Sequence, residues 1–490
     1  MALRNRAAAA AAIAGIWTGY NGLLYAADAT KRYRIEAAWF LLSAILIVIA
    51  IDAIARGSQP APRSQSSNPR KLIIGLAIFL IGAAALYFPI LPIGLLSDDF
   101  TLLARAESGA LADPAWEFLR PLPLLLWRIL KAPIALHALN IVLHGLNAWL
   151  TAMVATRFGL RRIAALLAGL VFLAMPSSVE AVAWAAGVFD VLMVTLILGA
   201  CVATTSMANG AKQFAAIAAL TAAALATKET AVITPAILLI ASLGASKQLK
   251  NAAWPVAISA GVVAAYLAIR IAAGFSSAPP SADMSGYMLK EVLSRPFATL
   301  GLPFHAELLK SHGWIPYVFA LLWPLLFAMS ASQWRSDRAT AIRVLAGSTW
   351  ILASVLPLAT MLFIADDLQG SRYVYLGSAA FSIMLLALIA NLDQTVQMLI
   401  VISLIALFAV ATHSHQSAWI AAAHERDRVL AAFRDARIDC ANGEVRGLPD
   451  HVQGAYVFRN GFNDAVRRIT SSTPATCDLA WDGERFTVVR

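Results

Sequence analysis

Two adjacent carboxylates, Asp98 and Asp99, follow the first strongly apolar run of the main part of the chain. They lie in "LPIGLLSDDFTLLARAESG", which begins where a run long enough to cross a membrane ends. Carboxylates are costly inside a bilayer, so acids that persist at its edge are candidates for function. A carboxylate can also take a proton from a hydroxyl group. The pair therefore predicts an acid–base site at a membrane surface.

Other charged side chains recur in loops that we expect on the same side of the membrane. They are Arg120, Glu180, Asp190, Lys228, Glu229, Asp366, Asp367 and Arg372. Lysine and arginine suit a lipid phosphate, and the acids suit proton abstraction. We expect a cavity at the outer surface, with acids on one wall and cations on another. Two simpler interpretations stay open: Lys228 and Glu229 form a local ion pair, or Arg372 anchors its helix at the bilayer interface.

A polar stripe follows one face of the predicted helix "IALHALNIVLHGLNAWL". His137, Asn140, His144 and Asn147 are spaced 3, 4 and 3 residues apart, which places them on one face. Interhelical hydrogen bonds are the simpler role for the deeper His144 and Asn147. His137, nearer the outer end, is more open to a functional role. Two histidines at this spacing could bind a metal ion, but no further ligand in the sequence supports one.

The composition of the 490-residue chain is typical of a membrane protein. Hydrophobic residues make up 60% of the chain and charged residues 13%, and a soluble fold could not cover so much apolar surface. The formal net charge of +10 would suit nucleic acid, but the basic residues lie in short loops between apolar runs and no nucleic-acid-binding motif is present. We therefore expect the lipid bilayer as a partner and no nucleic acid.

A membrane-spanning helix needs about 20 apolar residues, and the sequence predicts about eleven such helices in a main bundle. Their cores are 72–95, 134–156, 162–176, 187–207, 213–227, 230–245, 252–274, 315–331, 343–364, 373–391 and 395–412. Two weaker runs precede them. The first resembles a signal peptide, but we favour a retained helix because another run follows closely. The predicted domains are an N-terminal helix pair (1–56), a cytoplasmic linker (57–71), the bundle (72–413) and a short outer α/β tail (414–490).

Positive charge in the loops predicts how the bundle is oriented. Lysines and arginines cluster before the first bundle span and again after the second, fourth, sixth and eighth spans, which marks those loops as cytoplasmic. The acid pair and the C-terminal tail then face outward. The basic residues Lys31, Arg32 and Arg34 conflict with this orientation, but only for the N-terminal helix pair.

The three cysteines fall into two groups. Cys201 lies in an apolar run and is expected to be a buried free thiol. Cys440 and Cys477 lie in the polar tail, and an outward-facing tail is in an oxidising compartment. A Cys440–Cys477 disulfide is therefore favoured over two free thiols.

Five stretches, taken in order, resemble the GT-C superfamily of integral-membrane glycosyltransferases, in particular the bacterial relatives of protein O-mannosyltransferases and TMTC-type proteins. They are "SDDF", "RPL…HALNIVLHGLNAWL", "MPSSVEAVAW…FD", "TKE" and "SRYVYLGS". They extend over residues 72 to about 380, most of the predicted bundle. The chain departs from the family pattern at Met175–Pro176, where the family has His-Pro, and at "TKE", where it has "SKE". The later stretch "GAYVFRNGFNDAVRR" also resembles the tail of bacterial relatives.

The resemblance implies a fold, a reaction and roles for residues. The fold is an all-α polytopic membrane bundle of GT-C type. The reaction moves a sugar, with inversion, from a polyprenyl-phosphate donor to a hydroxyl of a lipid, glycan or protein acceptor. Asp98 is implied as the general base, and Asp99 as a residue that positions the acceptor, Asp98 or, in some members, a divalent cation such as Mg²⁺ or Mn²⁺. Arg372 and Lys228 are implied as ligands of the donor phosphate. The substrate pocket is expected to contain Arg120, His137, Asn140, Glu180, Asp190, Glu229 and Tyr373.

The resemblance also implies a location, the bacterial inner membrane with the site and the C-terminus on the periplasmic face. Two other functions stay open. One is a transporter or flippase of lipid-linked sugars that uses the polar stripe as its pathway, although the sequence lacks the inverted repeats typical of such proteins. The other is an inactive scaffold subunit, against which the intact acid pair argues.

Overall fold

The computed structural model describes most of the chain from Pro69 onward. The described residues are 69–113, 118–207, 210–245, 249–275, 337–358, 362–365, 367–390, 394–436, 438, 443–470 and 476–489, with scattered positions between 292 and 300. The predicted N-terminal helix pair, most of the linker and the predicted span 315–331 lie outside these residues.

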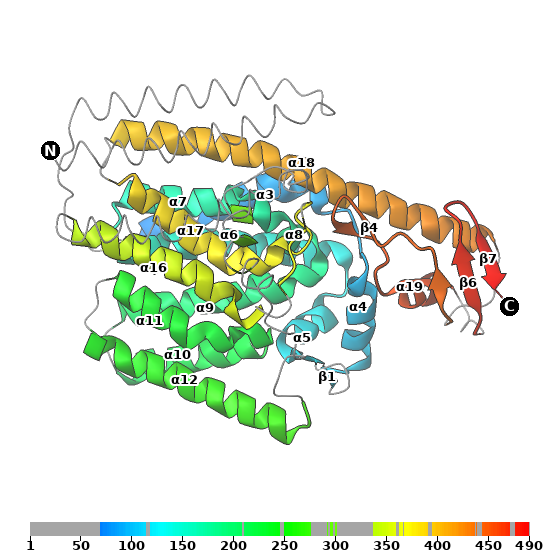
Figure 1. Ribbon diagram of the computed structural model, residues 1–490, viewed down its shortest axis with the longest axis horizontal. Coiled ribbons are helices and arrows are strands. Elements are labelled where there is room, and N and C mark those ends of the chain that lie inside the picture. The colour runs from blue at the N-terminus through cyan, green and yellow to red at the C-terminus, as the bar shows by residue number, and fades with distance from the viewer. Residues whose placement is uncertain are drawn as a thin grey trace.

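Helices dominate the described residues and form a bundle (Figure 1). Seven are long and apolar enough to cross a membrane, namely α3 (Pro69–Tyr87), α6 (Pro133–Arg157), α9 (Val188–Ser206), α12 (Leu249–Ala272), α16 (Arg338–Val355), α17 (Tyr375–Leu388) and α18 (Gln394–Asp435). An eighth span results if α7 (Arg162–Ala174) and the segment Pro176–Ala183, bent by 54° relative to it, are counted together. The architecture is that of an all-α multi-pass membrane protein, which confirms the predicted class.

Two predicted spans correspond to helices that are too short to cross a bilayer alone. The helix α10 (Ala211–Leu225) has 15 residues, and α11 (Thr234–Gly244) has 11 residues after the 3₁₀ turn η5 (Glu229–Ile233). Pro235 lies at the start of α11, where its missing N–H and fixed φ are tolerated in a first helical turn. Both short helices pack on α12. Within the described residues, seven or eight spans are long enough to cross a membrane, fewer than the predicted number of about eleven.

The helix α6 lies at the centre of the described bundle, where it packs against α3, α7 and α9. Close approach to α3 depends on Gly145, because a Cβ atom there would lie 3.0 Å from the carbonyl oxygen of Phe79. The polar stripe of α6 faces these neighbours and is fully buried. It therefore contributes to helix packing and does not face lipid.

Hydrogen bonds from the deeper half of the stripe join α6 to three other helices. His144 donates from Nε2 to the Leu173 carbonyl of α7 at 3.0 Å, and its Nδ1 lies 2.8 Å from the Tyr375 hydroxyl of α17. Asn147 donates from Nδ2 to the Val191 carbonyl of α9 at 2.9 Å. Inside a bilayer such groups need partners within the protein. The interhelical role predicted for His144 and Asn147 is confirmed.

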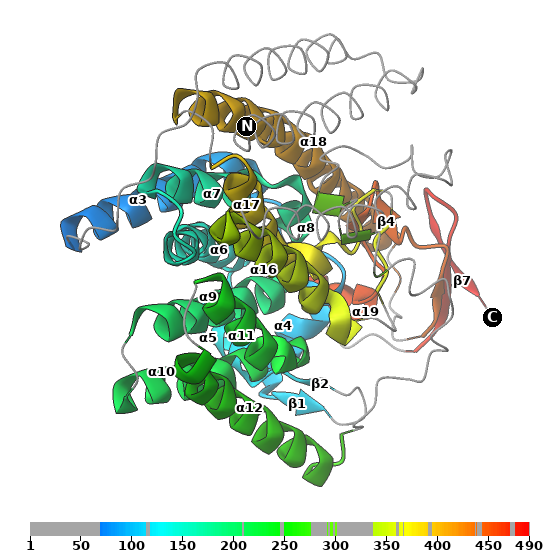
Figure 2. The ribbon, with the colours of Figure 1, turned by 60° about the vertical axis from the view of Figure 1, so that its left-hand side comes forward.

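The segment after α3 folds as a cap on one end of the bundle. It contains α4 (Asp98–Ser108), a small antiparallel pair formed by β1 (Ala112–Asp113) and β2 (Phe118–Leu119), and α5 (Pro121–Leu130). Figure 2 shows this segment near α9, which α5 contacts. The short α5 buries Leu124 and Trp127 and exposes Leu125 and Ile129. Such an apolar exposed face agrees with the predicted interfacial segment.

The helix α18 continues well past the bundle into the C-terminal tail (Figure 1). The predicted bundle–tail boundary at 413/414 lies inside this 42-residue helix. The tail contains a three-stranded sheet in the order β3–β6–β7, a β4–β5 hairpin and one helix. Their bounds are β3 (Val445–Arg446), β4 (His451–Val452), β5 (Ala455–Tyr456), α19 (Phe462–Ile469), β6 (Asp478–Trp481) and β7 (Phe486–Val489). In the sheet, β3 pairs parallel with β6, and β6 pairs antiparallel with β7.

The cysteines agree with the predicted grouping where they are described. Cys201 is a buried free thiol in α9, as predicted. Cys477, just before β6, is disulfide-bonded. Cys440, the remaining cysteine of the chain, lies outside the described residues.

Candidate acid–base site

The two adjacent acids at the start of α4 have different environments. Asp99 is fully buried, and its carboxylate accepts hydrogen bonds from the N–H groups of Leu96, at 2.9 Å, and Ala186, at 2.8 Å. Asp98 is partly exposed, and its Oδ1 accepts a hydrogen bond from Nδ2 of Asn460 at 2.7 Å. Asp99 therefore fixes the backbone, while Asp98 stays partly exposed to solvent.

Burial raises the pKa of Asp99 well above its ordinary value, although the N–H groups of Leu96 and Ala186 oppose the rise. Both Asp99 oxygens already have backbone partners, which leaves them poorly placed to bind a metal. Among the residues that the structure describes, no group of three or more His, Cys, Asp or Glu side chains is arranged to hold a metal ion. The described side chains around Asp99 thus do not fit a bound Mg²⁺ or Mn²⁺ ion.

Side chains from distant helices fix the loop that precedes α4. His137 of α6 donates from Nε2 to the Gly94 carbonyl at 2.9 Å. Arg426 of α18 donates from Nη1 to the carbonyls of Ile93, at 2.6 Å, and Leu95, at 2.7 Å. Three consecutive carbonyls of this loop are held by side-chain donors, which leaves the loop few alternative conformations. The position of Asp98 is therefore set by the bundle and by α18.

His137 and Asn140, both predicted in the substrate pocket, are fully buried. Asn140 donates from Nδ2 to the Trp184 carbonyl at 2.8 Å. The Trp184 indole N–H in turn donates to the Leu96 carbonyl at 3.2 Å. The structure thus places His137 and Asn140 as supports of the backbone beside the site.

The predicted acids and cations lie at the same end of the bundle, but they contact one another. Glu180, in α8 (Val179–Ala183), forms an ion pair with Arg372, in η7 (Ser371–Val374). Lys228 forms an ion pair with Asp190 of α9 at 2.5 Å, and Arg372 Nε lies 3.9 Å from Asp190. The prediction of acids and cations on opposite walls of a cavity is therefore wrong. Charged side chains that are buried away from water need partners of opposite charge, so these residues pair directly.

A second ion pair involves the residue next to Lys228. Glu229 accepts two hydrogen bonds from Arg120, at 2.9 Å from Nε and 2.5 Å from Nη2. The Arg120 guanidinium also lies 5.2 Å from the centre of the Phe189 ring. Lys228 pairs with Asp190 of α9, and Glu229, the first residue of η5, pairs with Arg120. The prediction of a local ion pair between Lys228 and Glu229 is therefore wrong, because each residue forms its ion pair with a residue of another element.

Aromatic rings surround the Arg372 guanidinium. Its central carbon lies 4.8 Å from the ring centres of Trp184 and Tyr373, and 5.7 Å from that of Tyr456 in β5. Arg372 also donates hydrogen bonds to the hydroxyls of Tyr373 and Tyr456, each at 3.2 Å. Burial raises the pKa of Tyr456 to about 12, which further favours its neutral phenol form. The tail thereby closes one side of the charged cluster.

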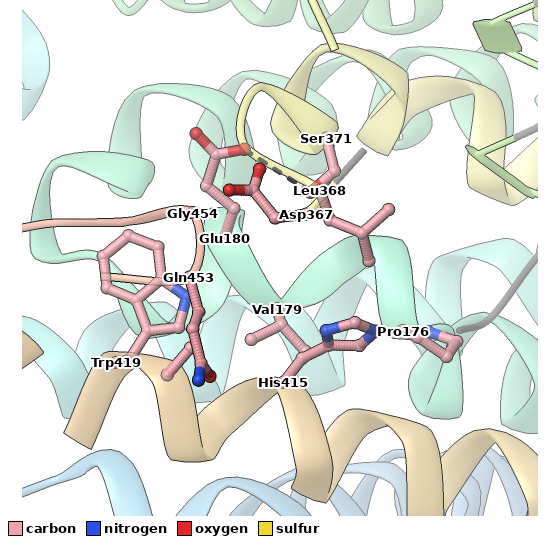
Figure 3. Close-up of a pocket in the computed structure, with 11 residues that line it drawn as sticks. Pro176, Val179, Glu180, Asp367, Leu368, Ser371, His415, Trp419, Gln453 and Gly454 are labelled. Atoms are coloured by element: carbon pink, nitrogen blue, oxygen red, sulfur yellow. Dashed lines mark hydrogen bonds between the residues drawn. The ribbon is translucent and has the colours of Figure 1, made fainter. Parts of the chain in front are cut away.

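A small pocket opens beside this cluster (Figure 3). It holds about 270 Å³ of empty space, part of it open to solvent. Its lining comes from the α7–α8 bend, the loop before η7, α18 and the β4–β5 turn, with Glu180, Asp367, Ser371, His415, Trp419 and Gln453 among the residues. Glu180 thus borders both the ion-pair cluster and a cavity. Asp366, the neighbour of Asp367, lies outside the described residues.

Several residues of the site were not predicted from the sequence. They are Trp184, Arg426, Tyr456, Arg459 and Asn460. Two of the quoted stretches, "MPSSVEAVAW" and "GAYVFRNGFNDAVRR", contain four of them, but neither stretch indicated a contact with the acid pair. Arg426 lies in a charged helical segment, "HERDR", where nothing in the sequence distinguishes it from Arg428.

Comparisons of this chain with protein-family models, curated proteins and solved structures find no match. The described fold and site define the class: an all-α multi-pass membrane protein with a partly exposed carboxylate beside a buried cluster of ion pairs.

Proposed function

We propose that this protein is a membrane glycosyltransferase. It moves a sugar from a polyprenyl-phosphate donor to a hydroxyl of a lipid, glycan or protein acceptor. The observation that carries the proposal is the pair of acids at the start of α4: Asp99 is buried and fixed, while Asp98 is partly exposed on an immobilised loop. A general base needs this combination of access and fixed position.

The proposed reaction is a direct displacement. The Asp98 carboxylate accepts the proton of the acceptor hydroxyl as its oxygen attacks the anomeric carbon. The bond between that carbon and the phosphate oxygen breaks, and polyprenyl phosphate leaves with the electron pair. The sugar inverts at this carbon. No general acid is required, because a phosphate held by cations is a good leaving group.

The ion-pair cluster supports a role in donor binding only indirectly. The resemblance implies Arg372 and Lys228 as phosphate ligands, but each already pairs with a buried carboxylate, Glu180 or Asp190. A phosphate would have to share these cations with the two acids. We propose that the cluster lines the donor-binding site with polar groups in fixed positions.

The proposed location is the inner membrane of a bacterium, with the acid pair on the periplasmic face. The support is the positive charge of the opposite loops, including Arg157, Arg161 and Arg162 at the far end of α6 from His137. A donor carried by a lipid can reach an outer-face site without a soluble sugar nucleotide.

The nature of the donor tests the proposal. Purified protein would be given radiolabelled polyprenyl-phosphate sugars, or the corresponding nucleotide sugars, together with total bacterial lipid and envelope acceptors. We expect label to reach an acceptor from a polyprenyl-phosphate sugar and from no nucleotide sugar. Transfer from nucleotide sugars alone would contradict the proposed donor, and absence of transfer from every donor would contradict the enzyme.

A further inference from the structure

The C-terminal tail forms part of the candidate site. The Ser97 N–H donates to the Val457 carbonyl at 2.9 Å, and the Asn460 N–H donates to the Ser97 hydroxyl at 3.3 Å. Asn460 also donates from its side chain to Asp98 at 2.7 Å. Ser97 has φ +49°, a conformation that residues other than glycine rarely adopt. The turn formed by residues 457–460 thus holds the residue before the acid pair in an unusual conformation.

Contacts between α4 and α19 keep this turn in place. The Thr101 hydroxyl donates to Asp464 at 2.7 Å, and Arg468 forms an ion pair with Glu107 at 2.5 Å. Figure 1 shows the two helices side by side. The tail is therefore docked along α4 at several points.

The charged cluster beside the site carries no net positive charge. It contains three cations and three carboxylates, which are Arg120, Lys228, Arg372, Glu180, Asp190 and Glu229. Each of the three cations forms an ion pair with one of the three carboxylates. A phosphate with up to two negative charges binds most strongly to a cation that is not already compensated.

Arg459 is such a cation. It is exposed, it directly precedes Asn460, and it forms no ion pair or side-chain hydrogen bond with the rest of the described chain. Its guanidinium lies over the Tyr456 ring, 5.7 Å from the centre. The Tyr456 hydroxyl contacts Arg372, so the tyrosine lies between the compensated cation and the uncompensated one.

We infer that Arg459 binds the phosphate of the lipid-linked donor. The inference deepens the proposed function and rests on it. The turn that contains Arg459 is tied to Asp98 through Asn460, so the phosphate-binding group and the base belong to one rigid unit. A planar guanidinium stacked on tyrosine keeps its outward N–H groups for two phosphate oxygens.

Binding of the leaving group tests this inference separately from sugar transfer. The full-length protein in detergent would be titrated with polyprenyl phosphate and with the uncharged polyprenol of equal length. The variants are Arg459→Ala and Arg459→Lys, and the control is Arg446→Ala, an exposed tail arginine that pairs with Glu444. Thermal unfolding of each variant checks that the tail stays folded.

We expect wild type to prefer the phosphate over the alcohol. Arg459→Ala should weaken phosphate binding by about 10- to 100-fold, the loss typical of a charge-assisted hydrogen bond. Arg459→Lys should give a smaller loss, and Arg446→Ala should bind as wild type. Equal binding by wild type and Arg459→Ala, or an equal loss in Arg446→Ala, would overturn the inference and leave the glycosyltransferase proposal standing. A wild type with no preference for the phosphate would overturn the proposed function itself.

Discussion

At the scale of single residues, two identical side chains at consecutive positions have opposite roles. Asp98 accepts one hydrogen bond from the tail and stays partly exposed, whereas Asp99 is buried against two backbone N–H groups. The sequence predicts that the pair is functional but does not distinguish the roles. The distinction depends on the Ala186 N–H, 87 residues farther along the chain.

This difference predicts the effect of removing each carboxylate on stability. Asp99→Ala leaves the N–H groups of Leu96 and Ala186 buried without acceptors, which costs about 1–3 kcal/mol for each group. Asp98→Ala, at a partly exposed position, should change the free energy of unfolding by at most about 0.5 kcal/mol. Thermal unfolding in detergent compares the two variants. Equal melting temperatures would show that Asp99 does not anchor the loop.

At the scale of elements, apolar runs predicted the positions of helices better than their ends. The run that ends near 412 predicted a span, yet α18 continues to Asp435 because a helix outside the bilayer can consist of polar residues. The predicted outer helix "WIAAAHERDRVLAAFRDAR" is its continuation. The contact of this extension with the loop before α4 depends on the direction in which α18 leaves the bundle, which hydropathy does not encode.

The extension of α18 gives a prediction about Arg426. Arg426→Ala removes the donor to the Ile93 and Leu95 carbonyls, so the loop that carries Asp98 should loosen. We expect a lower melting temperature and a reduced rate of transfer, with binding of polyprenyl phosphate largely kept. Arg428→Ala is the matched control, because Arg428 pairs with Glu425 on the same helix and does not contact this loop. Similar losses in Arg426→Ala and Arg428→Ala would contradict this prediction. They would mean that the positive charge of α18, and not the hydrogen bonds of Arg426, supports the loop.

At the scale of the whole molecule, the polar residues expected on one side do meet at one end of the bundle. The expectation came from loop charge and helix counting, which need no atomic detail. The pairing of those residues could not be predicted, because Arg120 meets Glu229 and Lys228 meets Asp190 only once the helices between them in the chain are packed. The contribution of the tail was missed for the same reason.

The orientation of the molecule gives a prediction that needs no knowledge of the reaction. Glu484→Cys, in the exposed β6–β7 turn, and Lys212→Cys, exposed at the start of α10, lie on opposite sides in our account. A membrane-impermeant maleimide added to bacteria with a permeable outer membrane should label the first cysteine and not the second. Wild type is the control, because Cys201 is buried and Cys477 is disulfide-bonded. Labelling of Lys212→Cys and not of Glu484→Cys would show that the protein has the opposite orientation in the membrane.

The most direct measurement is the rate of sugar transfer from a polyprenyl-phosphate donor by wild type, Asp98→Asn and Asp435→Asn. Asp435 is an exposed carboxylate at the end of α18 and serves as the matched control. Loss of a general base reduces rates by about 10²- to 10⁴-fold, so Asp98→Asn should transfer sugar at this reduced rate with an unchanged melting temperature. Asp435→Asn should match wild type. Transfer by Asp98→Asn at the wild-type rate would contradict the assignment of Asp98 as the base.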